Sequence, residues 1–283
     1  MGFKVETNAE KANVKPFLRW AGGKRWLVKH LDNILGNLDY QSYHEPFLGS
    51  GAIFFALNPS KKIFLSDLNQ ELIDTYNALK ENPKDIIEKL KGYKNTKDFY
   101  YHMRSTIYSD AVSRASRFIY LNQTSYNGIY RVNEKGIYNV PYGYRKKNFL
   151  EEETLRNASK RLENANVIYG DFDCIVPNLG EKDLVFLDPP YTVSHNDNGF
   201  IKYNQKLFSL DDQKRLRKLI DVIHDKKAYY LLTNAAHMTI QEIFERGDRQ
   251  IELNRASLIG GENAKRGSIM EYVFTNIPKG DVE

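Results

Sequence analysis

Short apolar runs alternate with longer segments of helical periodicity along most of the 283-residue chain. Residues 184–187 read Leu-Val-Phe-Leu, which is typical of a buried strand, whereas apolar residues recur every three or four positions over 210–223. Strands and helices that alternate in this way predict an α/β fold with helices packed on a mainly parallel sheet. The predicted strands are a short one ending at 45–47, then 63–66, 167–169, 184–187 and 229–232; the predicted helices are 24–35, 70–79, 111–121, 152–162, 210–223 and 239–244.

The two ends of this pattern differ from its middle. Segments 250–254 and 269–275 are predicted to form an antiparallel hairpin that closes one edge of the sheet. Residues 1–15 are polar and aperiodic, and we expect them to form a flexible tail.

A mainly helical segment interrupts the α/β pattern. Residues 69–122 have helical spacing in several pieces, and 127–141 predict a β-hairpin with a turn near 134–136. We therefore expect an inserted domain over 81–164. The catalytic domain would be formed by the segments on either side of it, 16–80 and 165–283.

Positive charge is concentrated in this insert. Residues 91–165 hold 14 Lys and Arg against 7 Asp and Glu, whereas the rest of the chain holds 27 against 29. The same stretch contains 10 of the 19 tyrosines. Cations interleaved with aromatic rings suit a surface that neutralises phosphates and stacks on bases. The alternative is a tyrosine-rich helical domain with solvated charged faces, and composition alone leaves both open.

Several classes of protein are excluded by composition. No apolar run approaches the roughly 20 residues of a membrane helix, and the N-terminal residues lack the apolar core of a signal peptide. We therefore expect a cytoplasmic protein that does not associate with a membrane. The single cysteine, Cys174, rules out an internal disulfide, and the six histidines lack metal-ligand spacing. We expect no bound metal.

The first candidate site is Glu-Pro-Phe-Leu-Gly-Ser-Gly at residues 45–51, followed by Asp67 at the end of the next predicted strand. The glycines at 49 and 51 allow the backbone to approach a ligand closely, and an acid at the second strand end suits two ribose hydroxyls. No phosphate-binding arrangement accompanies them, so a nucleoside without a pyrophosphate fits better than NAD. S-adenosylmethionine has that shape. The alternative is a tight turn between strand and helix.

The most specific motif is Asp188-Pro189-Pro190-Tyr191, which directly follows the apolar run 184–187. It therefore lies at the carboxyl end of a strand, where α/β proteins bind ligands. The prolines favour extended conformations and present carbonyl groups without competing amide donors. The Asp188 carboxylate and the Pro189 carbonyl could accept the hydrogens of an exocyclic amine while Tyr191 stacks on its base. The alternative is a strand-terminating turn with a packing tyrosine.

These motifs resemble the Dam-like family of DNA adenine-N6 methyltransferases, the alpha class, also called D12-type. The resemblance covers most of residues 16–275 and rests on Pro-Phe-Leu-Arg-Trp-Ala-Gly-Gly-Lys at 16–24, on the 45–51 motif, on Asp-Pro-Pro-Tyr, and on their order and spacing. Hairpin residues Tyr126-Asn127-Gly128-Ile129-Tyr130-Arg131 resemble the recognition hairpin of the family. The resemblance implies a Rossmann-like methyltransferase core that uses S-adenosylmethionine without a metal, and an inserted domain that recognises the DNA target.

The resemblance also implies roles for particular residues. Catalysis would fall to Asp188, Pro189, Pro190 and Tyr191. The cofactor would contact Trp20, Ala21, Gly22, Gly23, Lys24, Glu45, Phe47, Gly49, Ser50, Gly51, Asp67, Asp171, Phe172 and Asp188. The DNA would contact Arg19, Tyr126, Asn127, Ile129, Arg131 and Pro141, with Arg131 reading a guanine in the major groove. After the fifth strand the family often has Asn-His-Asp, whereas this chain has Thr233-Asn234 followed by Ala235-Ala236-His237.

The sequence thus predicts transfer of a methyl group from S-adenosylmethionine to the N6 atom of a flipped adenine in duplex DNA, and the resemblance favours GATC as the site. There are three alternatives. The DNA site could be a longer one that contains GAT, the target could be an RNA amine or cytosine N4, or the protein could be a catalytically inactive nucleic-acid binder. We expect a monomer or weak dimer that associates with the nucleoid through DNA.

Overall fold

The computed structural model describes residues 14–192, 208–256 and 268–279. The chain divides into two compact units. The first unit comprises Met1–Arg25, Gly49–Ser60 and Asn69–Val167, and the second comprises Trp26–Leu48, Lys61–Leu68 and Ile168–Glu283. The predicted tail over 1–15 lies outside the described residues apart from Val14 and Lys15. The predicted insert, 81–164, falls entirely within the first unit, and its domain boundaries stay a prediction.

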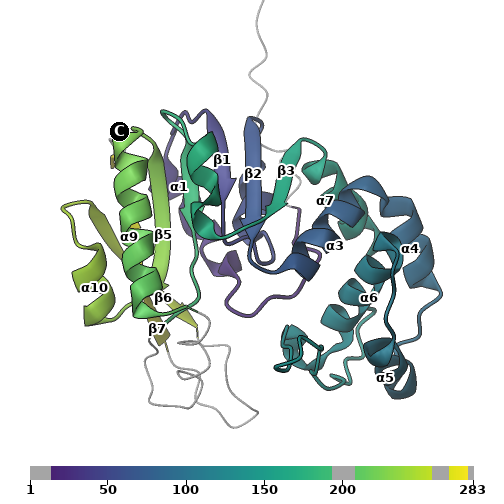
Figure 1. The fold of residues 1–283 in the computed structure, drawn as a ribbon. Helices are drawn as coiled ribbons and strands as arrows, with labels where there is room; N and C mark the ends of the chain where they lie inside the picture. Colours follow the sequence, from purple (N-terminus) through teal and green to yellow (C-terminus); the bar gives the residue numbers. More distant parts are fainter. Residues whose placement is uncertain (1–13, 193–207, 257–267, 280–283) are drawn as a thin grey trace, which may run out of the picture. The chain divides into compact units, whose positions relative to one another are not determined.

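A seven-stranded sheet in the order β3-β2-β1-β4-β5-β7-β6 confirms the predicted Rossmann-like α/β fold (Figure 1). The strand β1 is parallel to β2 and β4, and β4 is parallel to β5. The strand β7 is antiparallel to both β5 and β6, which confirms the predicted C-terminal hairpin at the edge of the sheet. The strands are β1 Ser42–Glu45, β2 Lys62–Asp67, β3 Ala165–Tyr169, β4 Leu184–Leu187, β5 Tyr229–Ala235, β6 Arg249–Ala256 and β7 Ser268–Thr275.

Apolar side chains of the second unit pack the helices α9 (Leu210–Asp225) and α10 (Met238–Phe244) against β4, β5 and β7 (Figure 1). The helix α9 begins with a capping box in which Ser209 and Asp212 satisfy each other's backbone amides. The four residues of β4 are all buried, which explains why its sequence is continuously apolar rather than alternating.

The predicted helix over 24–35 was wrong as a single element. Its place is taken by two 3₁₀ turns, Lys24–Trp26 and Val28–His30, and the short helix α1, Leu31–Leu35. Leu27, Leu31 and Ile34 are nevertheless buried. The pattern reported the buried face correctly, but spacings of three and four residues do not by themselves distinguish 3₁₀ turns from an α-helix.

Helices dominate the first unit, as predicted for the insert. They are α2 Ala52–Leu57, α3 Gln70–Glu81, α4 Pro83–Lys91, α5 Lys97–Ser105, α6 Ala111–Thr124 and α7 Glu152–Leu162. The helix α6 packs against α3, α4 and α5. Side chains of Asn69, Thr96 and Asp110 cap the N-termini of α3, α5 and α6, which explains where these helices begin.

The tyrosines of the insert serve its core more than its surface. Tyr100, Tyr120, Tyr138 and Tyr142 are all less than 9% exposed. Their hydroxyls donate to backbone carbonyls, those of Val140, Lys94, Ile129 and Asn95 respectively. For these four residues the structural reading of the tyrosine-rich composition holds, because buried hydroxyls require acceptors and find them in the loops.

A buried hydrogen bond between His44 and Asp183 links two parallel strands of the second unit. His44 Nε2 donates to Asp183 Oδ2 at 3.1 Å, and the Gly180 amide donates to the same oxygen at 2.7 Å. Burial acts to raise the pKa of Asp183, but the hydrogen bonds from His44, Gly180 and Ser42 outweigh it and lower the pKa overall. The carboxylate therefore joins β1 to the start of β4.

We expect Asp183→Asn to lower the free energy of unfolding by about 1–3 kcal/mol at pH 7, because it removes a charged acceptor from buried donors. A carboxyl whose pKa is depressed by folding stabilises the protein above its unfolded pKa of about 3.9, and that contribution is lost as the pH falls through the folded pKa. Urea denaturation of the original protein and of Asp183→Asn from pH 7 to pH 3 should show that the difference between their free energies of unfolding shrinks below about pH 4. A difference independent of pH would contradict this account.

Candidate functional site

The Asp-Pro-Pro-Tyr loop begins where β4 ends, as the sequence predicts. The carboxylate of Asp188 accepts a hydrogen bond from Thr233 Oγ1 at 2.8 Å. Thr233 lies on β5, is fully buried, and also reaches the carbonyl of Leu187 at 3.4 Å. Because β4 and β5 are parallel neighbours, their carboxyl ends meet at one edge of the sheet. The fold thereby fixes the carboxylate at the position where α/β sheets bind ligands.

Tyr191 is held by a second polar group. Its hydroxyl donates to Glu271, and Arg255 donates to the other oxygen of the same carboxylate. Burial, reinforced by the charges of Asp188 and Glu271, raises the pKa of Tyr191 well above its usual value. The hydroxyl thus stays a donor at any physiological pH, and its bond to Glu271 fixes the position of the tyrosine side chain.

The C-terminal hairpin supplies this carboxylate by strand register. Glu271 on β7 lies opposite Leu253 on β6, and Arg255 is two residues further along β6. Residues i and i+2 face the same side of a sheet, and a long side chain can reach its diagonal neighbour. Glu271 is 0% exposed, so Arg255 and Tyr191 supply the compensation that a buried charge requires.

A further layer of polar side chains backs the loop. Thr192 donates to the carbonyl of Phe208 at 2.9 Å and accepts from Gln213 Nε2 at 3.0 Å. Gln213 Oε1 in turn accepts from Asn234 Nδ2 at 3.0 Å. All three side chains are buried, so α9 and β5 hold the end of the Asp-Pro-Pro-Tyr loop through satisfied hydrogen bonds.

Part of the predicted cofactor set lies in the second unit. Glu45, at the end of β1, is 2% exposed and accepts from Tyr43 at 2.6 Å. At the end of β2, the carbonyl of Asp67 accepts from the Gly170 amide at 3.2 Å, which joins the predicted ribose position to the loop before Asp171. Leu68, next to Asp67, is 58% exposed although it is a large apolar residue.

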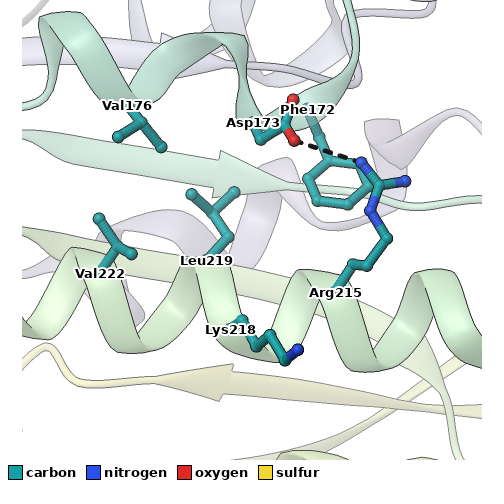
Figure 2. Close-up of a pocket in the computed structure, with 7 residues that line it drawn as sticks. All are labelled: Phe172, Asp173, Val176, Arg215, Lys218, Leu219 and Val222. Atoms are coloured by element: carbon teal, nitrogen blue, oxygen red, sulfur yellow. Dashed lines mark hydrogen bonds and ion pairs between the residues drawn. The ribbon is translucent and has the colours of Figure 1, made fainter.

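The Asp171–Phe172 pair is packed under a basic residue. The guanidinium of Arg215 lies 4.7 Å from the centre of the Phe172 ring and pairs with Asp171 at 2.7 Å. It also pairs with Asp173 at 3.2 Å (Figure 2). The hydrogen bond to Asp171 is the main cause that raises the pKa of Arg215. Phe47 stacks on Phe172 at 5.5 Å. Phe172 is only 2% exposed, so its ring is a packing surface in this structure.

A cavity of about 250 Å³ adjoins this pair. It is lined by Phe172, Asp173, Val176, Arg215, Lys218, Leu219 and Val222, all from the Phe172–Asn178 3₁₀ helix and from α9 (Figure 2). Figure 2 shows the apolar Val176, Leu219 and Val222 on one side of the view, and Asp173 and Arg215 on the other.

The rest of the predicted cofactor set lies in the first unit. Gly49 has φ +47°, and a Cβ there would come within 2.9 Å of the Trp20 ring, so only glycine fits between the turn and the indole. The carbonyl of Gly49 accepts from Tyr76 at 3.1 Å. Gly51 has φ +64° and forms the N-terminal end of α2. Gly49 and Gly51 are therefore required here by backbone conformation, and Gly49 also by the Trp20 ring, whereas their approach to a ligand stays a prediction.

The Trp-Ala-Gly-Gly-Lys segment forms a tight turn. The Gly23 amide donates to the Trp20 carbonyl at 3.2 Å, and Lys24 Nζ donates to the Gly22 carbonyl at 3.0 Å. Lys24 is 4% exposed, so its ammonium group points into the protein rather than into solvent. Ala21 and Gly22 are exposed.

The predicted recognition hairpin is closed by two isolated antiparallel bridges, Ser125–Tyr142 and Val132–Tyr138, instead of regular strands. The Tyr126 amide donates to the Pro141 carbonyl at 2.9 Å. Tyr126 itself is 55% exposed, and Asn127 has φ +52°. The Tyr126–Asn127 corner is therefore a tight, solvent-facing turn, whereas the carbonyl of Ile129 accepts from the buried Tyr138 hydroxyl at 2.9 Å.

Two predicted DNA-binding arginines have different surroundings. Arg131 is exposed, and its Nε donates to Asn139 Oδ1 across the hairpin at 2.8 Å. Arg19 instead reaches the carbonyls of Gln123 and Ser125, and a Cβ at Gly128 would lie 2.5 Å from its Cβ. Burial lowers the pKa of Arg19. In this structure Arg19 supports the base of the hairpin.

Sequence reasoning missed Thr233, Glu271, Gln213 and Leu68. The comparison with the family pattern concerned the residues that follow Thr233-Asn234, yet the two side chains themselves contact Asp188 and Gln213. An acid within the apolar stretch of a predicted edge strand is the signal that could have identified Glu271. The exposed Leu68 had no signal beyond its place next to Asp67.

Within residues 14–192, 208–256 and 268–279, no group of three or more His, Cys, Asp or Glu side chains comes together as a metal site. No helix in the same part of the chain is long and apolar enough to cross a membrane.

A Rossmann-like sheet with Asp-Pro-Pro-Tyr at the carboxyl end of β4 defines a methyltransferase that acts on exocyclic amines. Residues 20–257 match the model of the D12 class N6 adenine-specific DNA methyltransferases. The chain belongs to this family, which uses S-adenosylmethionine.

Similar proteins support the same assignment. The type II methyltransferase M1.LlaDCHI of Lactococcus lactis subsp. cremoris is 34% identical over 94% of this chain and 96% of its own length. The type II methyltransferase M.MjaIII of Methanocaldococcus jannaschii is 36% identical over 78% of this chain and 84% of its own length. The DNA adenine methylase of Escherichia coli K12 is 29% identical over 86% and 89%.

We expect Thr233→Val to lower kcat about tenfold or more, because a hydrogen bond to a charged group contributes roughly 1.5–3 kcal/mol and its loss releases the Asp188 carboxylate. Thr275→Val is the matched control. Thr275 is equally buried, and its hydroxyl donates to the Tyr230 carbonyl rather than to a loop residue. Steady-state methyl transfer should therefore fall for the first variant alone. Equal losses in both variants would show a general packing effect.

Proposed function

We propose that this protein methylates the N6 atom of adenine in duplex DNA at GATC, after the base has turned out of the helix. The observation that carries the proposal is the Asp188 carboxylate at the end of β4, oriented by Thr233 and followed on the same loop by a tyrosine whose hydroxyl is fixed by Glu271. Extrusion is required because an exocyclic amine within a base pair cannot enter a protein pocket.

The chemistry explains this choice of residues. The lone pair of an adenine amine is delocalised into the ring, so the nitrogen is a poor nucleophile. Acceptors at the Asp188 carboxylate and the Pro189 carbonyl bind its two hydrogens and favour a tetrahedral nitrogen with an available lone pair. Pro190 has no amide hydrogen to compete for that carbonyl. Tyr191 stacks on the base and fixes its plane, so rate enhancement comes from orientation and electrostatics.

The chemistry of the proposed cofactor residues suits S-adenosylmethionine, which supplies an electrophilic methyl group when bound. The buried Glu45 carboxylate suits its ammonium group, and Asp67 suits the ribose hydroxyls. Asp171 can accept from the adenine amine while the exposed Leu68 covers an apolar ring face. Gly49 and Gly51 have positive φ angles, which favour glycine, and the absence of side chains lets the cofactor come close to their backbone. The other residues proposed to line the cofactor are Trp20, Ala21, Gly22, Gly23, Lys24, Phe47, Ser50, Phe172 and Asp188.

DNA recognition is proposed for the 125–142 hairpin. Arg131 is exposed and has its Nε held by Asn139, which leaves the two terminal nitrogens of the guanidinium directed as a pair, the arrangement that reads guanine O6 and N7. Tyr126, Asn127, Ile129 and Pro141 would position bases around the extruded adenine, and Arg19 would support them from below. The GATC assignment rests on the resemblance of this hairpin to Dam-type enzymes and on relatives named DNA adenine methylases.

Methyl transfer from labelled S-adenosylmethionine tests the proposal directly. The substrates are otherwise identical duplexes with GATC, with GATATC and with neither, together with an RNA control, and products are identified as nucleosides. We expect N6-methyladenine in the GATC duplex alone, and none from Asp188→Ala, which should still bind S-adenosylhomocysteine. Label in GATATC but not in GATC would replace the proposed site with the longer one, and equal label in both would show that the enzyme reads only the shared GAT. Label in cytosine or RNA would overturn the substrate.

Arg131→Ala should reduce discrimination between GATC and duplexes changed at the guanine, by about 1–3 kcal/mol or roughly 5- to 150-fold in kcat/KM. Lys135→Ala is the control, since Lys135 is an exposed cation at the turn of the same hairpin. The control should weaken all duplexes to a similar extent, because a phosphate contact carries no sequence information. Unchanged discrimination in Arg131→Ala would remove this residue from base reading.

A further inference from the structure

Tyr130 connects the hairpin to the predicted cofactor loop. It directly precedes Arg131, yet its ring stacks on Trp20, with centroids 5.7 Å apart and planes inclined by 18°. The Trp20 indole in turn lies against Gly49, where a Cβ would approach it within 2.9 Å. A tyrosine of the hairpin, the indole and the glycine turn thus form one continuous stack inside the first unit.

The other end of Tyr130 is anchored. Its hydroxyl donates to Glu71 Oε2 at 3.1 Å, and Arg117 pairs with Glu71 Oε1 at 3.2 Å. Burial, with the nearby Glu71 charge, raises the pKa of Tyr130, so the hydroxyl remains a donor. Glu71 lies in the first turn of α3, whose N-terminal cap is Asn69. The ring therefore contacts Trp20 while its hydroxyl contacts the start of the helix that follows Asp67 in the chain.

We propose that Tyr130 couples DNA reading to cofactor binding by holding Trp20 against the Gly49 turn when the hairpin engages its target sequence. This inference rests on the proposed function, since it takes Trp20 as a cofactor residue and Arg131 as a base reader. Hairpin residues 129–131 are consecutive, so a shift of Arg131 towards a guanine displaces Tyr130. A stacked ring transmits that displacement to Trp20, because packed side chains have few alternative arrangements.

Coupling of this kind is reciprocal. If the duplex tightens binding of the cofactor, the cofactor tightens binding of the duplex by the same factor, which is typically 5- to 150-fold. A purely structural role for Tyr130 would behave differently. Its ring also packs on Phe118 and Tyr138, so the loss of packing would destabilise the protein. Such a loss of stability would not bring the ratio of the two cofactor affinities, measured with and without the duplex, to one.

The test uses S-adenosylhomocysteine and a GATC duplex as probes. Calorimetry gives the Kd of S-adenosylhomocysteine with and without saturating duplex, and the duplex Kd is then measured in the converse experiment. We expect a ratio of roughly 5 or more in the original protein. The ratio should fall to within twofold of unity in Tyr130→Met, which keeps apolar volume but lacks a flat ring. It should fall only in part in Tyr130→Phe, which keeps the stack on Trp20 but loses the hydrogen bond to Glu71.

Tyr142→Met is the matched control. Tyr142 is 8% exposed on the opposite side of the same hairpin, but its ring contacts Tyr100 and Tyr144 and its hydroxyl contacts Asn95. The control should keep the original ratio. If Tyr130→Met does not fold, Glu71→Ala decides, because it removes the anchor of the Tyr130 hydroxyl from a partly exposed position and should lower the ratio at least twofold.

The outcomes separate this inference from the function on which it rests. A ratio of unity in an original protein that methylates adenine overturns the coupling and leaves the proposed function intact. An unchanged ratio in Tyr130→Met, or in Glu71→Ala where that variant decides, also overturns it. Failure of the original protein to bind S-adenosylhomocysteine or to methylate DNA overturns both.

Discussion

Glu271 is a fully buried carboxylate, and the need to compensate its charge organises the end of the sheet that carries the Asp-Pro-Pro-Tyr loop. An ionised group without partners in such surroundings would be strongly destabilising. Arg255 supplies the charge, and Tyr191 supplies a hydroxyl donor. Tyr191 is consequently positioned by the same contacts that allow the C-terminal hairpin to pack, so the fold of β6 and β7 and the geometry of the Asp-Pro-Pro-Tyr loop depend on each other.

The neighbouring carboxylate follows the same physical rule with a different partner. Asp188 receives the hydroxyl of Thr233, while Asn234, pointing to the other side of β5, binds Gln213 on α9. Because side chains alternate along β5, Thr233 supports the Asp188 carboxylate from one face of the strand, and Asn234 supports the end of the Asp-Pro-Pro-Tyr loop from the other.

Within the first unit the insert has two kinds of aromatic residue. Tyr100, Tyr120, Tyr138 and Tyr142 build its core, and their hydroxyls hold the loops that shape the hairpin. Tyr126 remains exposed at the corner of that hairpin. A composition rich in tyrosine and cations therefore reflects both the packing of the insert and its proposed DNA surface, and only exposure distinguishes the two.

The sequence by itself determined the order of strands and helices, the position of Asp-Pro-Pro-Tyr after β4, the glycine turn and the family. These features depend on local periodicity, on proline and glycine geometry and on motif spacing, all of which lie within short stretches of chain. It did not determine that 24–35 is broken into 3₁₀ turns. Nor did it determine that Arg19 supports the base of the hairpin, or that Thr233 and Glu271 hold the Asp-Pro-Pro-Tyr loop. The contacts of Arg19, Thr233 and Glu271 join residues 45 to 106 positions apart, so only strand register and packing in the folded chain could bring them together.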